Sequence, residues 1–186
     1  MSAWDVGLLA RRLTTGIYVH SAAVAIARAT WGQESPPTAP VTEYLGAGFV
    51  RRSDGTAHEY DWCHHIEVAR TDLGLNDELD RMWFASAVVL LGDALAAEDY
   101  FDRAPILEMV RHLRNGIAHG NRFEIRDPSA LAEWPAHTRD AACCSQSGAT
   151  FEITSELNDM RVLFDYMGPG DVLDVLISVG TRLLAR

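Results

Sequence analysis

The sequence predicts a mainly helical protein in which four to five helices form a bundle and one or two small β-hairpins are inserted. Apolar residues recur at helical spacing over several long stretches, and residues that start or stop helices border these stretches. The chain has 186 residues and 48% hydrophobic content, which suffices to bury one good core. We therefore expect a single domain over residues 1–186.

The apolar pattern places four helices along the chain. The first is expected over about 3–30, where Val6, Leu9, Leu13 and Ile17 form a stripe. The second is expected over about 77–99, because Asn76 is a good capping residue and Asp77-Glu78 follow it at the positive end of the helix dipole. The third and fourth are expected over about 103–119 and 169–185.

Two stretches between the helices, about 41–72 and 121–167, predict irregular structure with hairpins. Ser53-Asp54-Gly55-Thr56 is a good turn between short alternating segments, which predicts the first hairpin. The residues after it, 62–73, fit either a short helix or a strand. A second hairpin is expected between 151–154 and 162–166, with a helix over 156–167 as the alternative.

The helix expected over 103–119 carries the most informative stretch of the chain. Pro105 suits a first helical turn, where its missing N–H has no intrahelical partner. At about 100° per residue, an apolar stripe gathers on one side, made of Ile106, Val110, Leu113 and Ile117. The opposite side carries Glu108, His112, Asn115 and His119, with Arg111 and Arg114 nearer its edges. A helix with this division presents a site, a partner surface or a solvated face.

The segment Arg114-Asn115-Gly116-Ile117-Ala118-His119-Gly120 resembles the Arg-x4-His signature of the HEPN superfamily. The resemblance implies a small helical bundle, and for many members a metal-independent ribonuclease or a prokaryotic toxin. It also implies that Arg114, Asn115 and His119 lie near a helix end at a dimer interface. These three residues are therefore the candidate catalytic residues.

Their chemistry suits RNA cleavage by the substrate's own 2′-hydroxyl. Such cleavage needs a base for the hydroxyl proton, a cation for the charged transition state and an acid for the leaving oxygen. An imidazole titrates near neutrality, so we assign His119 as the acid or base. Arg114 would hold the phosphate with its planar guanidinium, and Asn115 would orient the imidazole or the sugar. RNA is the expected substrate.

The spacing of Arg114 and His119 raises a geometric difficulty. Five residues on an ideal helix turn through about 500°, so the two side chains diverge by roughly 140°. One chain holding both on one phosphate needs the helix to deform at Gly116 or to end before His119. The resemblance implies another solution, a homodimer in which two copies of the motif meet. Secondary candidates for the site are Arg111, Glu108 and His112.

Charge limits how RNA would be bound. The net charge of −10 argues against broad nucleic-acid affinity, which depends on cations that neutralise phosphates. Residues 111–126, however, carry four arginines against Glu124 alone, while residues 71–100 carry seven acids against Arg81. We expect one positive groove, with Arg122 and Arg126 as its RNA-binding residues.

Other functional classes lack support in the sequence. Cys63, Cys143 and Cys144 do not make a disulfide framework, and no ligand spacing predicts a metal site or another cofactor. The sequence shows no signal segment and no run of membrane-spanning length, so a cytoplasmic protein without a membrane partner is expected.

Two further readings of the motif remain open. The first is that residues 111–122 are a solvated helix end, with Gly120 as its cap. The second is a non-catalytic HEPN-like module that binds a protein or nucleotide partner through the same groove. If the nuclease is a toxin or defence effector, a cognate antitoxin is an expected partner.

Overall fold

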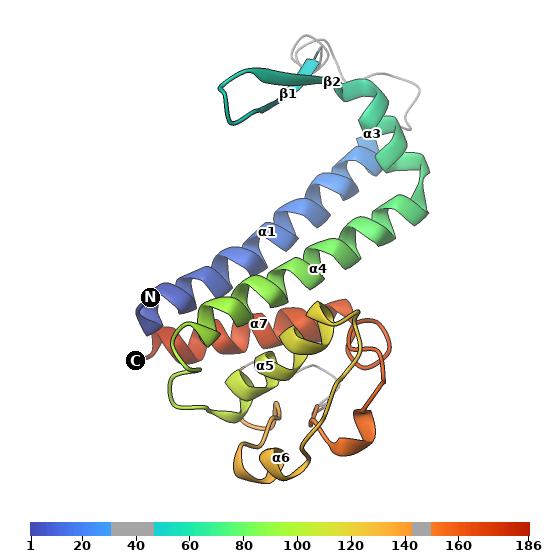
Figure 1. Ribbon diagram of the computed structural model, residues 1–186. Coiled ribbons are helices and arrows are strands. Elements are labelled where there is room, and N and C mark those ends of the chain that lie inside the picture. Colours follow the sequence, from blue (N-terminus) through green and yellow to red (C-terminus); the bar gives the residue numbers. More distant parts are fainter. Residues whose placement is uncertain (31–46, 143–149) are drawn as a thin grey trace. The chain divides into compact units, whose positions relative to one another are not determined.

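The computed structural model is mainly helical with one antiparallel hairpin, as predicted (Figure 1). It describes residues 1–30, 47–142 and 150–186. Four long helices occur where the sequence places them, and two shorter helices and a 3-10 turn accompany them in the described ranges. The helices are α1 (Ala3–Thr30), α3 (Trp62–Thr71), α4 (Leu73–Ala96), α5 (Pro105–Ala118), α6 (Ser129–Glu133) and α7 (Pro169–Leu184), and η1 (Ser155–Leu157) is the turn.

The described chain divides into two units, which are treated separately below. Unit 1 comprises Met1–Ile17 and Arg81–Arg186, and unit 2 comprises Tyr18–Asp80. Cys143, Cys144 and the start of the predicted insert, residues 41–46, lie outside the described residues. The expectation of a single domain stays a prediction.

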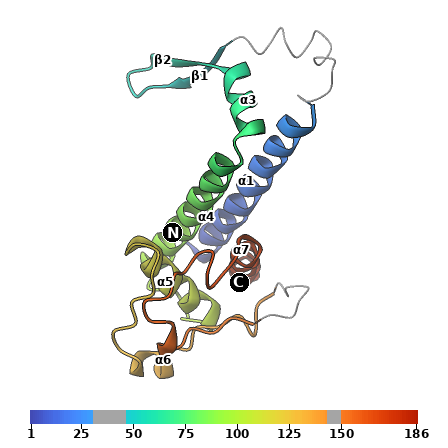
Figure 2. The ribbon, with the colours of Figure 1, turned by 90° about the vertical axis from the view of Figure 1, so that its right-hand side faces the viewer.

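Unit 1 holds the hydrophobic core. Figures 1 and 2 show α5 beside α7, and the unit 1 parts of α1 and α4 side by side. Each helix contributes fully buried side chains, among them Val6 on α1, Leu91 on α4, Leu113 on α5 and Leu176 on α7. The segment between α5 and α7 closes the core with Phe123, Ala136, Ile153, Val162, Leu163 and Met167. Three of the four residues in the predicted α5 stripe are buried, while Ile117 is half-buried.

Unit 2 contains the first predicted hairpin. β1 (Ala47–Arg51) pairs antiparallel with β2 (Ala57–Asp61), and Gly55 occupies the turn with a φ of 87°. Asp61 caps the following helix by accepting a hydrogen bond from the His64 backbone N–H at 3.1 Å. This helix, α3, settles the open alternative for residues 62–71 in favour of helix.

The predicted start of α4 is wrong. The helix begins at Leu73, because the Asp72 carboxylate accepts the Leu75 N–H at 2.9 Å and so supplies the cap. Asn76 lies inside the helix and is 5% exposed. Its amide donates to the Ala69 and Asp72 carbonyl oxygens, at 2.6 and 3.0 Å. Asn76 thus joins α3 to α4 instead of starting a helix.

The second predicted hairpin is also wrong, and so is its helical alternative. Residues 151–153 pair with 136–138, where the Ile153 N–H donates to the Ala136 carbonyl at 2.9 Å. Residues 160–162 pair instead with 121–123, through isolated bridges and loop hydrogen bonds. Each segment thereby buries an apolar side chain in the unit 1 core, an advantage that a hairpin between the two does not offer.

At Gly116, the loop residues Arg122 and Val162 pack closely against α5. A Cβ at Gly116 would lie 2.5 Å from Val162 Cγ2 and 3.0 Å from the Arg122 carbonyl oxygen. The Arg122 N–H also donates to the Gly116 carbonyl at 3.0 Å, so the returning chain cannot move away without losing that bond.

We predict that Gly116→Ala lowers the free energy of unfolding by about 2 kcal/mol, because overpacking against backbone outweighs the better helix propensity of alanine. Denaturant unfolding followed by circular dichroism measures this change. The matched control is Gly170→Ala on α7, where an added Cβ meets nothing within 4 Å. Equal stability of the two variants would contradict the prediction.

Candidate functional site

The end of α5 separates His119 from the helix that carries Arg114. The helix ends at Ala118, and His119 follows as its cap with φ −103° and ψ 40°. Gly120 has a φ of 85°, the left-handed conformation that reverses the chain. The 140° divergence calculated for a continuous helix therefore does not apply to His119. Its side chain is exposed.

Arg114 is held on α4 by close packing and by an ion pair. Gly92 makes room for it, since a Cβ there would lie 2.5 Å from Arg114 Cβ and Cγ. The guanidinium Nε and Nη2 donate to Asp93 Oδ1, at 2.8 and 2.6 Å. Its Nη1 donates to Asn115 Oδ1 at 3.2 Å. Arg114 is thus fixed by an acid that the motif does not contain.

The three candidate catalytic residues are therefore joined only in part. Arg114 and Asn115 are linked through their side chains, whereas Asn115 meets His119 through its backbone carbonyl, which accepts the His119 N–H at 3.0 Å. Within the described residues, no side-chain hydrogen bond or ion pair connects His119 to Arg114 or to Asn115.

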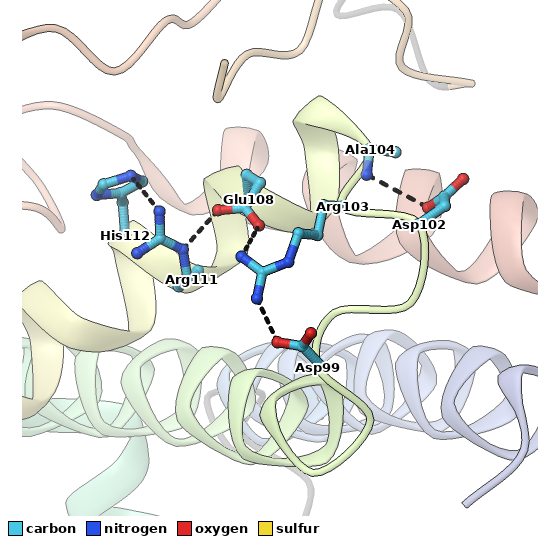
Figure 3. A network of polar contacts seen from close by, with 7 residues as sticks. All are labelled: Asp99, Asp102, Arg103, Ala104, Glu108, Arg111 and His112. Carbon is cyan, nitrogen blue, oxygen red and sulfur yellow. Dashed lines mark hydrogen bonds and ion pairs between the residues drawn. The ribbon is translucent and has the colours of Figure 1, made fainter. Parts of the chain in front are cut away.

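Glu108 was expected on the polar side of the helix, and its position is the largest departure from that expectation. Its side chain is fully buried, at 0% exposure. Arg111 Nε donates to one carboxylate oxygen at 2.5 Å, and Arg103 Nη1 donates to the other at 3.3 Å. Figure 3 shows the carboxylate between these two guanidinium groups, with Asp99 on the far side of Arg103. Two cations thus make the burial of this charge tolerable.

The connection between α4 and α5 adopts a strained conformation that places Arg103. Four residues in it have left-handed φ angles between 46° and 55°, namely Asp99, Tyr100, Phe101 and Arg103. This conformation costs a non-glycine residue steric energy, so other contacts must stabilise it. Arg103 supplies several, since it pairs with Asp99 and Glu108 and lies 5.0 Å from the Trp134 ring centroid.

His112 is half-buried next to Arg111. Burial, followed by the nearby Arg111 charge, lowers the pKa of His112 from 6.5 to about 4. Arg111 Nη2 lies 3.3 Å from His112 Nε2, and an arginine only donates, so Nε2 accepts and the ring is neutral. His112 is therefore a poor acid at neutral pH.

Carboxylates pair with the arginines of the predicted positive groove and neutralise most of its charge. Arg111 meets Glu108, Arg114 meets Asp93, and the expected RNA-binding residues are paired as well. Arg122 Nη1 lies 3.3 Å from Asp159 Oδ1, and Arg126 Nη2 lies 2.5 Å from Glu124 Oε1. Glu108, Asp93 and Asp159, which lie outside residues 111–126, thus offset the positive balance counted along that stretch.

A cavity of about 520 Å³ adjoins the motif in unit 1. Ile117 and Gly120, on either side of His119 in the chain, line it together with Arg81 of α4 and with Arg161 and Phe164 of the loop before α7. Sequence reasoning missed the last three residues. Arg81 and Arg161 belong to no local motif. Phe164 lies in the alternating stretch 162–166, which is typical of a strand.

Comparison of the chain with models of protein families, with characterised proteins and with solved structures finds no match. Within the described ranges, no helix is long and apolar enough to cross a membrane. Nor do three or more His, Cys, Asp or Glu residues gather there in a way that would hold a metal ion.

We predict that Glu108→Gln lowers the free energy of unfolding by about 3 kcal/mol, because it leaves Arg103 and Arg111 without their buried counter-charge. Denaturant titration measures the loss. The control is Glu124→Gln, which removes the same charge from the exposed pair with Arg126 and should change stability little. Similar losses in both variants would show that the buried carboxylate has no special role.

We also predict that His112 makes the protein less stable in acid. The unfolded chain takes up a proton as the pH falls through 6.5, whereas the folded state resists protonation down to a pKa of about 4. Stability is therefore lost as the pH falls between these values, by about 2 kcal/mol from pH 7 to pH 5. Unfolding curves of wild type and His112→Gln at both pH values test this. An identical pH dependence in the two proteins would refute it.

Proposed function

We propose that this protein is a metal-independent endoribonuclease of HEPN type that acts in the cytoplasm as a homodimer. The observation that carries the proposal is the end of α5 at Ala118, which leaves His119 exposed between Ile117 and Gly120, two residues that line a cavity together with two arginines. A toxin or defence effector regulated by an antitoxin is the biological role that fits such an activity. The motif Arg114-Asn115-x-x-x-His119 supports the same assignment.

The proposed reaction uses the 2′-hydroxyl of RNA as the nucleophile. One imidazole takes the hydroxyl proton, the 2′-oxygen attacks the adjacent phosphorus, and a second group protonates the departing 5′-oxygen. The products are a 2′,3′-cyclic phosphate and a 5′-hydroxyl. Only the 2′-hydroxyl and proton transfers are needed, so no metal takes part in these steps.

Two copies of the chain would supply the two proton-transfer groups. His119 is one exposed imidazole per chain on this helix end, and His112 is kept neutral by burial. A two-fold dimer that joins the α5 ends brings two His119 side chains to one phosphate, one as base and one as acid. Arg114 would then exchange Asp93 for the phosphate, which presents a similar arrangement of oxygens to its guanidinium.

The pairing of Arg114 with Asp93 also favours a second function. An arginine that already has a carboxylate partner stabilises the contact of α4 with α5. In that case the motif would be structural, and the exposed helix end would belong to a non-catalytic module that binds a protein or nucleotide partner.

Cleavage of RNA by the purified protein in excess EDTA separates the two functions. We expect cleavage with 2′,3′-cyclic phosphate ends, detected by mass spectrometry, and no cleavage of RNA that has 2′-deoxyribose at the scissile positions. His119→Ala should abolish cleavage, since it removes the proton-transfer group. Arg114→Lys should lower the rate about 100-fold, because it keeps the charge but loses the planar guanidinium.

Two controls make these results interpretable. Arg12→Ala, an exposed change on α1, should cleave like the wild type. The melting temperature of His119→Ala should stay near that of the wild type, since its side chain is exposed and leaves no cavity. No cleavage by wild type, or unchanged cleavage by His119→Ala, rejects the nuclease. A monomer by light scattering at micromolar concentration rejects the two-histidine site.

A further inference from the structure

The cavity beside the motif has the size and position of a ligand subsite. Its volume of about 520 Å³ lies within the range of pockets that bind small organic molecules. Ile117 and Gly120 line one side, so the cavity adjoins the helix end that carries His119. All of its lining residues belong to unit 1.

A planar cation and an aromatic ring face each other in this cavity. The Arg81 guanidinium carbon lies 5.0 Å from the centroid of the Phe164 ring. Phe164 is 36% exposed, so part of this large apolar residue remains in contact with solvent. Nucleobases stack on aromatic rings, and the part of the Phe164 ring that Arg81 does not cover is open to such a base.

The backbone at Phe164 and at its neighbour Asn121 is strained. Phe164 has a φ of 77° and Asn121 a φ of 62°, and both residues line the cavity. A left-handed conformation is unusual for a bulky side chain. The Asn121 side chain holds the loop by bonding to Leu163 N and O, at 2.9 and 3.2 Å. The turn at Phe164, closed by its N–H donating to the Met167 carbonyl at 2.8 Å, buries Leu163 and Met167 and leaves Phe164 itself exposed.

The cavity also contains an arginine without a counter-ion. Within the described residues, the Arg161 guanidinium has no ion-pair or hydrogen-bond partner, unlike Arg114, Arg122 and Arg126. Asp165 is the one acid among the lining residues, against Arg81 and Arg161. Arg161 can therefore hold a phosphate without first giving up a carboxylate.

We infer that this cavity binds one nucleotide of an RNA strand, with the base on the part of the Phe164 ring that Arg81 leaves exposed and a phosphate on Arg161. The inference rests on the proposed function for the identity of the strand as the substrate. It adds the residues that would select and position the nucleotide next to His119. The subsite lies within one chain, so nucleotide binding needs no second copy.

Nucleotide binding is measured on the full-length His119→Ala protein, so that no cleavage interferes. Each of the four ribonucleoside 5′-monophosphates is titrated by calorimetry, with ribose 5-phosphate as the ligand that lacks a base. We expect saturable binding of at least one nucleotide, and binding of ribose 5-phosphate that is weaker by about 5- to 100-fold, the range for loss of one base stack.

Single substitutions test which residues bind the nucleotide. Phe164→Gly removes the ring while suiting a φ of 77°, so it keeps the loop and should weaken nucleotide binding about 5- to 100-fold. Phe164→Tyr keeps a stacking surface and should bind like the parent. Arg161→Ala should weaken both nucleotide and ribose 5-phosphate. Arg12→Ala, the matched charge control, should change neither. Circular dichroism checks that each variant is folded.

The outcomes separate this inference from the nuclease proposal. Binding that depends on Phe164 and Arg161, without any RNA cleavage by wild type, supports the subsite and rejects the nuclease. Cleavage of RNA with the same rate and base preference in Phe164→Gly rejects the subsite and leaves the nuclease. No nucleotide binding, equal affinity for ribose 5-phosphate, or equal weakening by Arg12→Ala also overturns the subsite.

Discussion

The burial of the Glu108 carboxylate constrains α5 and the connection that leads into it from α4. A fully buried charge is tolerated only when cations and hydrogen bonds replace water, and here Arg111 and Arg103 do so. Arg111 comes from the same helix and needs no special backbone. Arg103 reaches Glu108 only because the preceding residues take left-handed conformations.

The same connection fixes where α5 lies against its neighbours in unit 1. Burial opposes ionisation of Asp102, but hydrogen bonds from Arg182 and the Ala104 N–H, with the charges of Arg182 and Arg186, outweigh it and lower the pKa of Asp102. Asp102 thereby ties the start of α5 to the end of α7. Once that start is fixed, Arg114 faces Gly92 and Asp93, and the helix ends next to the cavity.

The sequence predicted those features of α5 that depend on neighbouring residues. Pro105 indicated the start, the apolar spacing indicated the buried stripe, and Gly120 indicated the end. The burial of Glu108 was not predictable in this way, because a helical projection gives the direction of a side chain and not what covers it. Arg103 covers it from a conformation that no local sequence pattern signals.

The second predicted hairpin and the predicted positive groove fail for one physical reason, which is competition between local and distant partners. Residues 151–154 and 162–166 alternate as strands do, but each finds a partner in a different segment that also buries its apolar side chain. The Asp93 partner of Arg114 is likewise 21 positions away. For the same reason Arg161 and Phe164 reach the cavity through the pairing of residues 160–162 with 121–123, which packs against Gly116.

In the proposed function, the distribution of charge would decide which arginine binds a phosphate first. The chain has a net charge of −10, and the arginines of the motif region are already paired with carboxylates. A phosphate that binds Arg114 must displace Asp93, whereas one that binds Arg161 displaces only water. Binding would therefore begin at the cavity, and the exchange at Arg114 would follow only when the strand is already held.

The proton transfers give the remaining argument for a second copy. Transesterification needs a base and an acid in one cycle, and within α5 and its cap the alternative imidazole, His112, has a pKa of about 4. It is almost wholly unprotonated at neutral pH and cannot donate to the leaving oxygen. His119 in one chain can act as base or acid for a given phosphate, but a second His119 allows both. In the proposed reaction, a second copy would therefore supply the group that protonates the leaving oxygen, whatever the angle between Arg114 and His119.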